Sequence, residues 1–175
     1  MWRIEEGGQL MEIYKEARLS EDGIYRYTLT RTPNDVCTTP HRKRINFIML
    51  NPSTADASID DPTIRRCMGF AWGWGFEQLT VTNIFALRST DPANLYTHDD
   101  PIGDDNDNTL LIEACSAAKV IMAWGTHGAF KGRGKTVQTL LKGVPLFHLG
   151  LTKEGHPKHP LYLAKSTAPV EFSAN

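Results

Sequence analysis

Four short apolar runs recur along the chain, and each one stops at polar or turn-forming residues. They are INFIML at 45–50, QLTVTNIF at 78–85, KVIMAWG at 119–125 and VPLFHLG at 144–150. Runs of this length, rich in branched and aromatic side chains, are typical of buried strands. Because helix-forming segments lie between them, the pattern predicts an α/β protein with a mostly parallel, four-stranded central sheet. Helices on both faces would make it a three-layer α/β/α sandwich.

The segments between the strands carry signals for helix ends. Asp61 precedes Pro62, and an acidic cap followed by proline at the first helical position predicts that a helix begins there. Asp107 or Asn108 is expected to cap a second helix, TLLIEACSAA. A third, short helix is expected at TVQTLLKG, residues 136–143.

The N-terminal part of the chain has a different pattern. Residues 24–31, IYRYTLTR, alternate apolar or aromatic with polar side chains, which predicts a half-buried strand. We therefore expect residues 1–44 to form an N-terminal β-hairpin and extension, followed by a core over 45–165. The length of 175 residues fits one domain, 1–175, because single domains mostly run to about 100–200 residues.

Composition narrows the class of protein. Apolar residues make up 41% and charged residues 22%, as in ordinary globular proteins. No apolar run approaches the roughly 20 residues of a membrane-spanning helix, and the start of the chain is acidic where a signal peptide would be basic. We expect a cytoplasmic protein without membrane contact. Its three cysteines form no CxxC, so neither a disulfide framework nor a zinc or iron–sulfur site is indicated, and we expect no cofactor.

The net charge of −1 conceals two oppositely charged blocks. Residues 89–114 hold seven acidic and no basic side chains, whereas residues 126–165 hold seven basic and one acidic side chain. A near-neutral chain does not coat nucleic acid by bulk charge, but a local basic rim can hold phosphates. A solvated loop is the alternative for either block. The candidate phosphate contacts are Lys131, Arg133, Lys158 and Lys165.

Ligands of parallel sheets bind outside the carboxyl ends of the strands, and amides end two of the predicted strands. Asn51 stands in MLNPS after the first strand, and Asn83 stands in TNIFALRSTDP on the second. His159 begins HPLYL after the last strand. Each asparagine alone could be a turn former. Together and in this order, the three motifs indicate a site.

These motifs resemble those of the uracil-DNA glycosylase superfamily over about residues 45–165. MLNPS is similar to its Gly-x-Asn-Pro-Gly motif with Met49 in place of glycine, and TNIFALRSTDP is similar to Thr-Asn-Val-Val-Lys-Cys-Arg-Pro-Pro of one branch. HPLYL is similar to that branch's His-Pro-Ser-Tyr-Leu. The chain also resembles a bacterial and phage family that has the signature NPSTAD, DDPT and a WG pair and no assigned function.

The resemblance implies a metal-free, monofunctional DNA glycosylase that leaves an abasic site. Asn51 would position the attacking water, Asn83 would pair with the edge of a flipped pyrimidine, and His159 would donate to its O2 oxygen. His156 is the alternative for the histidine role. The expected partner is duplex DNA with one base flipped out, and no protein partner is implied.

The resemblance also suggests which base is excised. Strict uracil enzymes have a large tyrosine after the proline of the first motif, whereas this chain has Ser53. The smaller residue predicts a pocket for a C5-modified pyrimidine, with defence against phages that carry modified DNA as the role. Further substrate contacts are expected from Pro52, Thr54, Asp60, Asp61 and Arg88. Helix capping is the alternative for Asp61, and a surface ion pair is the alternative for Arg88.

The segment after His159 completes the expected DNA interface. Leu161 and Tyr162 would form a wedge that fills the place of the extruded base, and Lys158 and Lys165 would hold phosphates beside it. Two other functions remain open. The changed first motif permits a non-catalytic nucleic-acid or nucleotide-binding module, and the pI of about 6.6 permits a hydrolase of free nucleosides or nucleotides.

Overall fold

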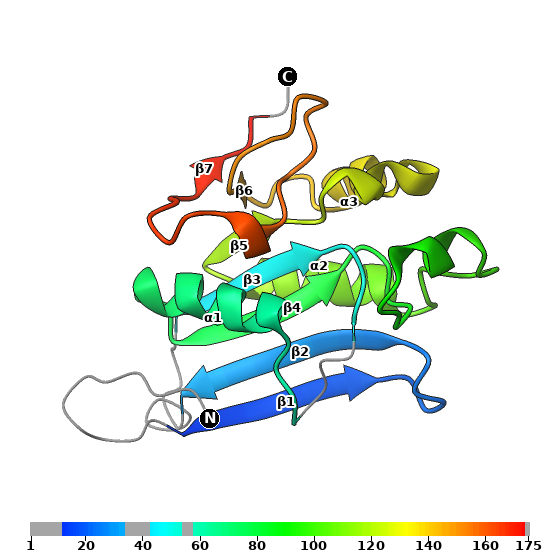
Figure 1. Ribbon diagram of the computed structural model, residues 1–175, viewed down its shortest axis with the longest axis horizontal. Helices are drawn as coiled ribbons and strands as arrows, with labels where there is room; N and C mark the ends of the chain where they lie inside the picture. Colours follow the sequence, from blue (N-terminus) through cyan, green and yellow to red (C-terminus); the bar gives the residue numbers. More distant parts are fainter. Residues whose placement is uncertain (1–11, 34–42, 54–57, 174–175) are drawn as a thin grey trace.

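A seven-stranded mixed sheet organises the chain in the computed structural model, which describes residues 12–33, 43–53 and 58–173 (Figure 1). In chain order the strands are β1 (Ile13–Leu19), β2 (Arg26–Pro33), β3 (Arg44–Met49), β4 (Gln78–Asn83), β5 (Lys119–Met122), β6 (Leu146–His148) and β7 (Val170–Glu171). Their order in the sheet is β1-β2-β4-β3-β5-β6-β7.

The four expected strands form the parallel centre of this sheet. Strand β3 pairs in parallel with β4 on one side and β5 on the other, and β5 pairs in parallel with β6. Phe47, in the middle of β3, lies between Val81 and Ile121 and is completely buried. The prediction of four parallel strands from the apolar runs is therefore confirmed.

The sheet is larger than the four strands expected. The hairpin of β1 and β2 is confirmed, but it extends the sheet, because β2 pairs antiparallel with β4. Strand β7 adds to the opposite edge, antiparallel to β6. Both additions cover edges of the parallel core that would otherwise present unpaired backbone groups. Two-residue β7 is too short to give a sequence pattern, so the prediction missed it.

Helices cover both faces of the sheet (Figure 1). Helix α1 (Pro62–Gly73) packs on the face that carries Ile45, Phe47 and Met49. Helices α2 (Asn106–Ser116) and α3 (Arg133–Leu140) pack on the opposite face with Ile48 and Leu50. Alternate residues of one strand thus belong to two separate cores, as the two-residue period of a strand requires. Three 3-10 turns connect these elements: η2 (Pro92–Tyr96), η3 (Thr126–Gly132) and η4 (Pro160–Tyr162).

The predicted helix starts are right for α1 and wrong for the other two. Asp61 caps α1, with its Oδ1 accepting from the backbone N–H of Ile64 at 2.8 Å. Helix α2 begins earlier than expected, at Asn106, and neither Asp107 nor Asn108 is its cap. Helix α3 begins at Arg133 instead of residue 136, directly after a left-handed glycine that ends η3.

Candidate active site

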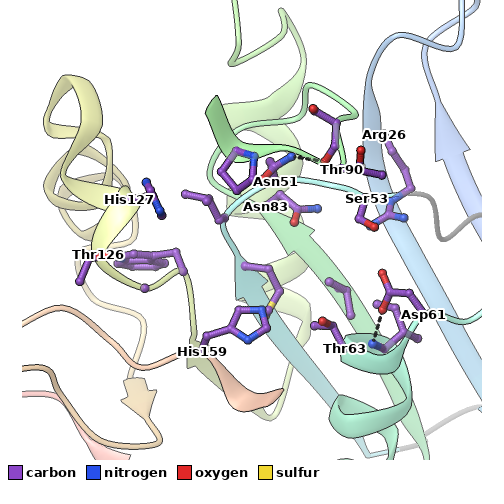
Figure 2. A pocket seen from close by; sticks show the side chains of 18 residues that line it. Arg26, Asn51, Ser53, Asp61, Thr63, Asn83, Thr90, Thr126, His127 and His159 are labelled. Carbon is purple, nitrogen blue, oxygen red and sulfur yellow. Dashed lines mark hydrogen bonds between the residues drawn. The ribbon is translucent and has the colours of Figure 1, made fainter. Parts of the chain in front are cut away.

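A pocket of about 340 Å³ opens at the carboxyl ends of β3, β4 and β5 (Figure 2). After β3 the chain leaves to α1 on one face, and after β5 it leaves through η3 to α3 on the other face. Neighbouring strands whose connections diverge in this way make a topological switch point, where α/β proteins bind ligands. The volume lies near the lower end of the range for small-molecule sites, about 300–1,000 Å³.

Five of the predicted site residues line this pocket although they come from distant segments. They are Asn51, Ser53, Asp61, Asn83 and His159. Pro52 is buried next to them, and Thr54 lies outside the described residues. The structure thus brings together the three motifs that the sequence analysis selected.

Asn51 joins the loop after β3 to the loop after β4. Its Nδ2 donates to the carbonyl oxygens of Ser89 at 2.9 Å and Pro52 at 3.1 Å. The Pro52 carbonyl also accepts from the Ser89 N–H at 2.8 Å. These bonds determine which end of the amide is the donor. Its Oδ1, which accepts no hydrogen bond within the described part of the chain, is the acceptor that Asn51 can offer to a ligand.

Asn83 presents a donor that the protein leaves unused. Its side chain is only 1% exposed and lines the pocket, yet Nδ2 has no hydrogen-bond partner among the described residues. An unsatisfied buried donor costs about 1–3 kcal/mol, so such groups are rare unless a ligand or water uses them. The end of β4 is held from behind, where Asn106 Nδ2 donates to the Asn83 carbonyl at 3.0 Å.

His159 is positioned as a neutral donor at the start of η4. Its Nδ1 accepts from the backbone N–H of Leu161 at 3.3 Å, which assigns the ring hydrogen to Nε2. Burial lowers the pKa of His159 below its ordinary value of 6.5, and the charge of Asp61 opposes this shift only in part. At neutral pH the ring is therefore uncharged. Figure 2 shows the ring directed towards the pocket.

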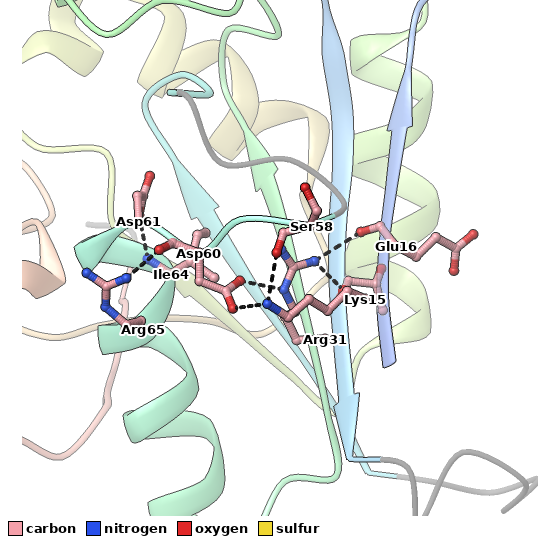
Figure 3. A network of polar contacts seen from close by, with 9 residues as sticks. Lys15, Glu16, Arg31, Ser58, Asp60, Asp61, Ile64 and Arg65 are labelled. Carbon is pink, nitrogen blue, oxygen red and sulfur yellow. Dashed lines mark hydrogen bonds and ion pairs between the residues drawn. The ribbon is translucent and has the colours of Figure 1, made fainter. Parts of the chain in front are cut away.

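Asp60 and Asp61 point in different directions. Asp61 lines the pocket and is the only acidic side chain that does so among the described residues. Asp60 faces the hairpin, where its carboxylate binds Arg31 Nε and Lys15 Nζ at 2.7 Å each (Figure 3). Burial raises the pKa of Asp60, but the bonds from Lys15 and Arg31 outweigh it and hold the pKa below 3.8. Asp60 therefore does not line the pocket, and its expected contact with the substrate stays a prediction.

Three other predicted contacts lie outside the pocket, and two of them have structural roles. Arg88 donates to the Gly23 carbonyl at 2.9 Å and so holds the tip of the hairpin. Arg133 is buried, and its guanidinium binds the Ile84 carbonyl and Asp107, so it does not belong to an exposed DNA surface. His156 lines a separate cavity beside α3. Of the two candidate histidines, only His159 shares a pocket with the asparagines.

The two residues of the predicted wedge, Leu161 and Tyr162, lie on different surfaces. Leu161 and Lys165 line a groove along α1, whereas Tyr162 projects outward and is 89% exposed. A wedge at this tip would consist of Tyr162. Lys158 and Lys131 are exposed and line none of these cavities.

Several pocket residues were not predicted. Arg26, at the start of β2, reaches the pocket because β2 runs antiparallel to β4 and so begins at the carboxyl end of that strand. No local signal in the sequence indicates this pairing. Trp124 and His127 follow β5, at a strand end that the ligand rule selects but that contains no recognised motif. Trp124 packs so closely on Gly128 that a Cβ there would lie 2.1 Å from its ring.

A family model described as a protein of unknown function, DUF1643, matches residues 26–161. The chain belongs to this family. The DUF1643 match begins at Arg26 and includes His159, so it spans every residue that lines the pocket. Nothing among curated proteins or solved structures matches the chain. The resemblance of this DUF1643 protein to uracil-DNA glycosylases therefore stays a prediction.

The described ranges of the DUF1643 chain contain neither a metal-binding cluster nor a membrane-spanning helix. In residues 12–33, 43–53 and 58–173, no group of three or more His, Cys, Asp or Glu side chains is arranged to hold a metal ion. None of the helices described is long and apolar enough to cross a membrane.

Proposed function

We propose that the protein is a DNA glycosylase that hydrolyses the N-glycosidic bond of a flipped-out pyrimidine and leaves an abasic site. The observation that carries the proposal is the meeting of Asn51, Asn83 and His159 in one pocket at the switch point. The unused donor of Asn83 supports a ligand with an acceptor on its edge, as pyrimidines have.

In the proposed reaction the oxygen of a water molecule bonds to C1′ of the sugar. The C1′–N1 bond breaks, and its electron pair moves onto the base. The Nε2–H of His159 donates to the O2 oxygen as negative charge develops there. Asn51 Oδ1 orients the water, and the Asp61 carboxylate takes the proton that the water loses. No lysine lines the pocket in the part of the chain that the structure describes, so hydrolysis is proposed without a covalent Schiff-base step.

The proposed base is a C5-modified pyrimidine. Ser53 lines the pocket where a large aromatic residue would close it in the strict uracil enzymes of the resemblance. A residue as small as serine leaves volume for a substituent at this position. Excision of such bases would act against phages whose DNA carries them.

The test is to identify the bases released from DNAs that carry uracil, 5-hydroxymethylcytosine or no modification. Mass spectrometry of the supernatant gives the base, and alkaline cleavage of the strand reports the abasic site. We expect release from the modified DNA and a loss of about 100- to 1,000-fold in His159→Ala, the size of one lost oxyanion donor. His156→Ala is the matched control because it alters a histidine of another cavity.

Each outcome decides one part of the proposal. Equal losses in His159→Ala and His156→Ala would contradict the assignment of His159. Release of uracil alone would contradict the C5 specificity. Binding of DNA without release of any base would indicate a non-catalytic binding module instead.

A second candidate function is hydrolysis of free nucleosides or nucleotides. It is favoured by the loop after β4, which forms one wall of the pocket through Ser89, Thr90 and Pro92. The same loop carries exposed Asp91, Asp99 and Asp100, whose charge would repel a nucleic-acid strand lying over it. Activity on monomers with none on oligonucleotides would establish this alternative.

A further inference from the structure

A groove of about 480 Å³ lies along α1, next to the pocket. The residues that define it are Arg65, Arg66 and Lys165 with Gly69, Gly73 and Leu161. Gly69 and Gly73 stand one helical turn apart, and a Cβ built on either would meet no other atom within 4 Å. Because no side chain fills this part of the helix surface, the groove can accept a ligand close to the backbone.

Among the described residues, the lining of the groove has three positive charges and no acidic side chain. Arg65 donates to the Asp60 carbonyl and Arg66 donates to the Leu163 carbonyl. Within the described residues, neither arginine nor Lys165 forms an ion pair with a carboxylate. Neutral carbonyls orient the guanidinium groups without neutralising them. Such preorganised, uncompensated cations favour an anionic ligand.

The groove and the pocket are neighbours, because residues at the start of α1 and residues around η4 line both of them. On the first turn of α1, Asp61 and Ile64 line the pocket whereas Arg65 lines the groove. On the segment of η4, His159 lines the pocket whereas Leu161 lines the groove. When one monomer of a polymeric ligand occupies the pocket, the neighbouring monomers therefore lie within reach of Arg65, Arg66 and Lys165.

The two sides of the pocket differ in charge. Beyond Asp61 at its N-terminus, α1 offers the cations of the groove, whereas the loop after β4, on another side of the pocket, is acidic (Figure 2). A polyanion that places one unit in the pocket is attracted along α1 and repelled from the loop. The difference in charge therefore favours a phosphate chain that runs along α1 over one that crosses the acidic loop after β4.

We propose that the groove binds the phosphodiester backbone of the strand whose base enters the pocket. This inference rests on the proposed function and adds that one strand, running along α1, supplies the contacts. Exposed Tyr162 lies on the same segment as the groove residue Leu161 and offers a ring on which a neighbouring base can stack. A single strand is therefore a sufficient substrate.

The test measures binding of a short fluorescein-labelled single strand that contains 5-hydroxymethylcytosine, as a function of salt concentration. The variant is Arg65→Gln with Lys165→Gln, and the matched control is Lys142→Gln with Lys153→Gln, two exposed lysines outside the groove. Both pairs change the net charge equally. For single strands each lost phosphate contact lowers the slope of log K against log salt by about 0.7.

We expect the groove variant to lose about tenfold or more in affinity and about 1.4 in slope, with the control close to the parent protein. Lys165→Gln alone should give about half of the slope change, and it alters a side chain with no hydrogen bond in the described residues. Thermal unfolding of each variant checks its fold.

Failure of the groove and failure of the proposed function give different results. If the two double variants lose affinity equally while the parent protein still releases the base, the groove does not bind the backbone but the proposed function stands. Release of bases only from free nucleosides, with no binding of the labelled strand, would overturn the proposed function and the groove together. Binding of duplex but not of single strands would overturn the single-strand inference.

Discussion

Asp60 and Asp61 are adjacent in the sequence, but they belong to two very different polar clusters. The cluster of Asp60 is closed, because Arg31 and Lys15 bind both of its carboxylate oxygens (Figure 3). The cluster of Asp61 is open, because Asn83 leaves a donor unused and His159 directs a ring towards the same pocket (Figure 2). A buried cluster whose charges are paired stabilises the fold, whereas an unpaired buried group that lines a cavity is a candidate for binding a ligand.

The largest expected effect comes from the carboxylate of the open cluster. Asp61→Asn keeps a capping side chain on α1 but removes the group that would take the proton of the attacking water. We expect base release to fall about 100- to 10,000-fold with the melting temperature little changed, because a general base contributes about that factor. Single-turnover assays and thermal unfolding measure the two effects.

Asp61→Ala is the comparison variant for this prediction. It removes the cap as well, at a cost of about 1 kcal/mol in the free energy of unfolding. If Asp61 acts only as a cap, Asp61→Asn will retain full activity and only the alanine variant will be impaired. That result would move Asp61 from the open cluster to the structural part of the molecule.

The closed cluster predicts a loss of stability. Asp60→Asn removes the negative charge that binds the completely buried Arg31 guanidinium. We expect the free energy of unfolding to fall by about 3 kcal/mol or more. Asp105→Asn is the matched control because the ion pair of Asp105 with Arg18 is exposed, and it should cost at most about 1 kcal/mol. Equal costs in chemical denaturation would show that Asp60 is not specially placed.

Asn83→Ala tests whether the cluster of Asp61 is open. It removes a buried polar side chain whose Nδ2 makes no hydrogen bond in the described residues. We expect a change of about 1 kcal/mol or less in stability. Discrimination between pyrimidines should fall by about 1–3 kcal/mol, as for one lost pairing of an amide with a base edge. Competition assays with mixed substrates measure it. A large loss of stability would mean that the amide belongs to a closed cluster.

The smallest predicted effects are those of pH, and the two clusters should respond in separate ranges. The folded state holds His159 below its ordinary pKa of 6.5, so acid protonates the unfolded chain first. Stability should therefore fall as the pH drops below about 6.5, until the lower folded pKa is reached. Protonation also removes the Nδ1 acceptor for the Leu161 N–H, so activity should decline in the same direction.

Asp60 also loses its contribution to the free energy of unfolding as the pH falls, but at a lower pH than His159. Its folded pKa lies below 3.8, so the stability it provides is complete above that value and is lost as the pH falls further. Unfolding curves of His159→Gln should show a smaller loss below pH 6.5, because His148, whose pKa burial also lowers, still contributes there, and they should keep the loss at lower pH. An undiminished first loss in this variant would contradict the assignment to His159.

Parts of this site were predictable because they depend on neighbouring residues. Local apolar runs and local turn chemistry predict the strand before Asn51, the strand that ends at Asn83 and the cap at Asp61. Arg26 was not predictable, because it reaches the pocket through the antiparallel pairing of β2 with β4. Nor could the sequence separate Asp60 from Asp61, since the partners of Asp60 lie on the distant hairpin.

The sequence by itself determined the parallel core, its hairpin and the order of the polar motifs at the strand ends. These features follow from the periodicity of apolar residues, which is a local property. Only the tertiary structure decided which polar residues are satisfied and which are left open. It places His159 in the pocket and His156 in a separate cavity, and it buries Arg133 beside Asp107. Whether a buried polar group has a partner depends on segments far apart in the chain, and the packing of the sheet decides which of them meet.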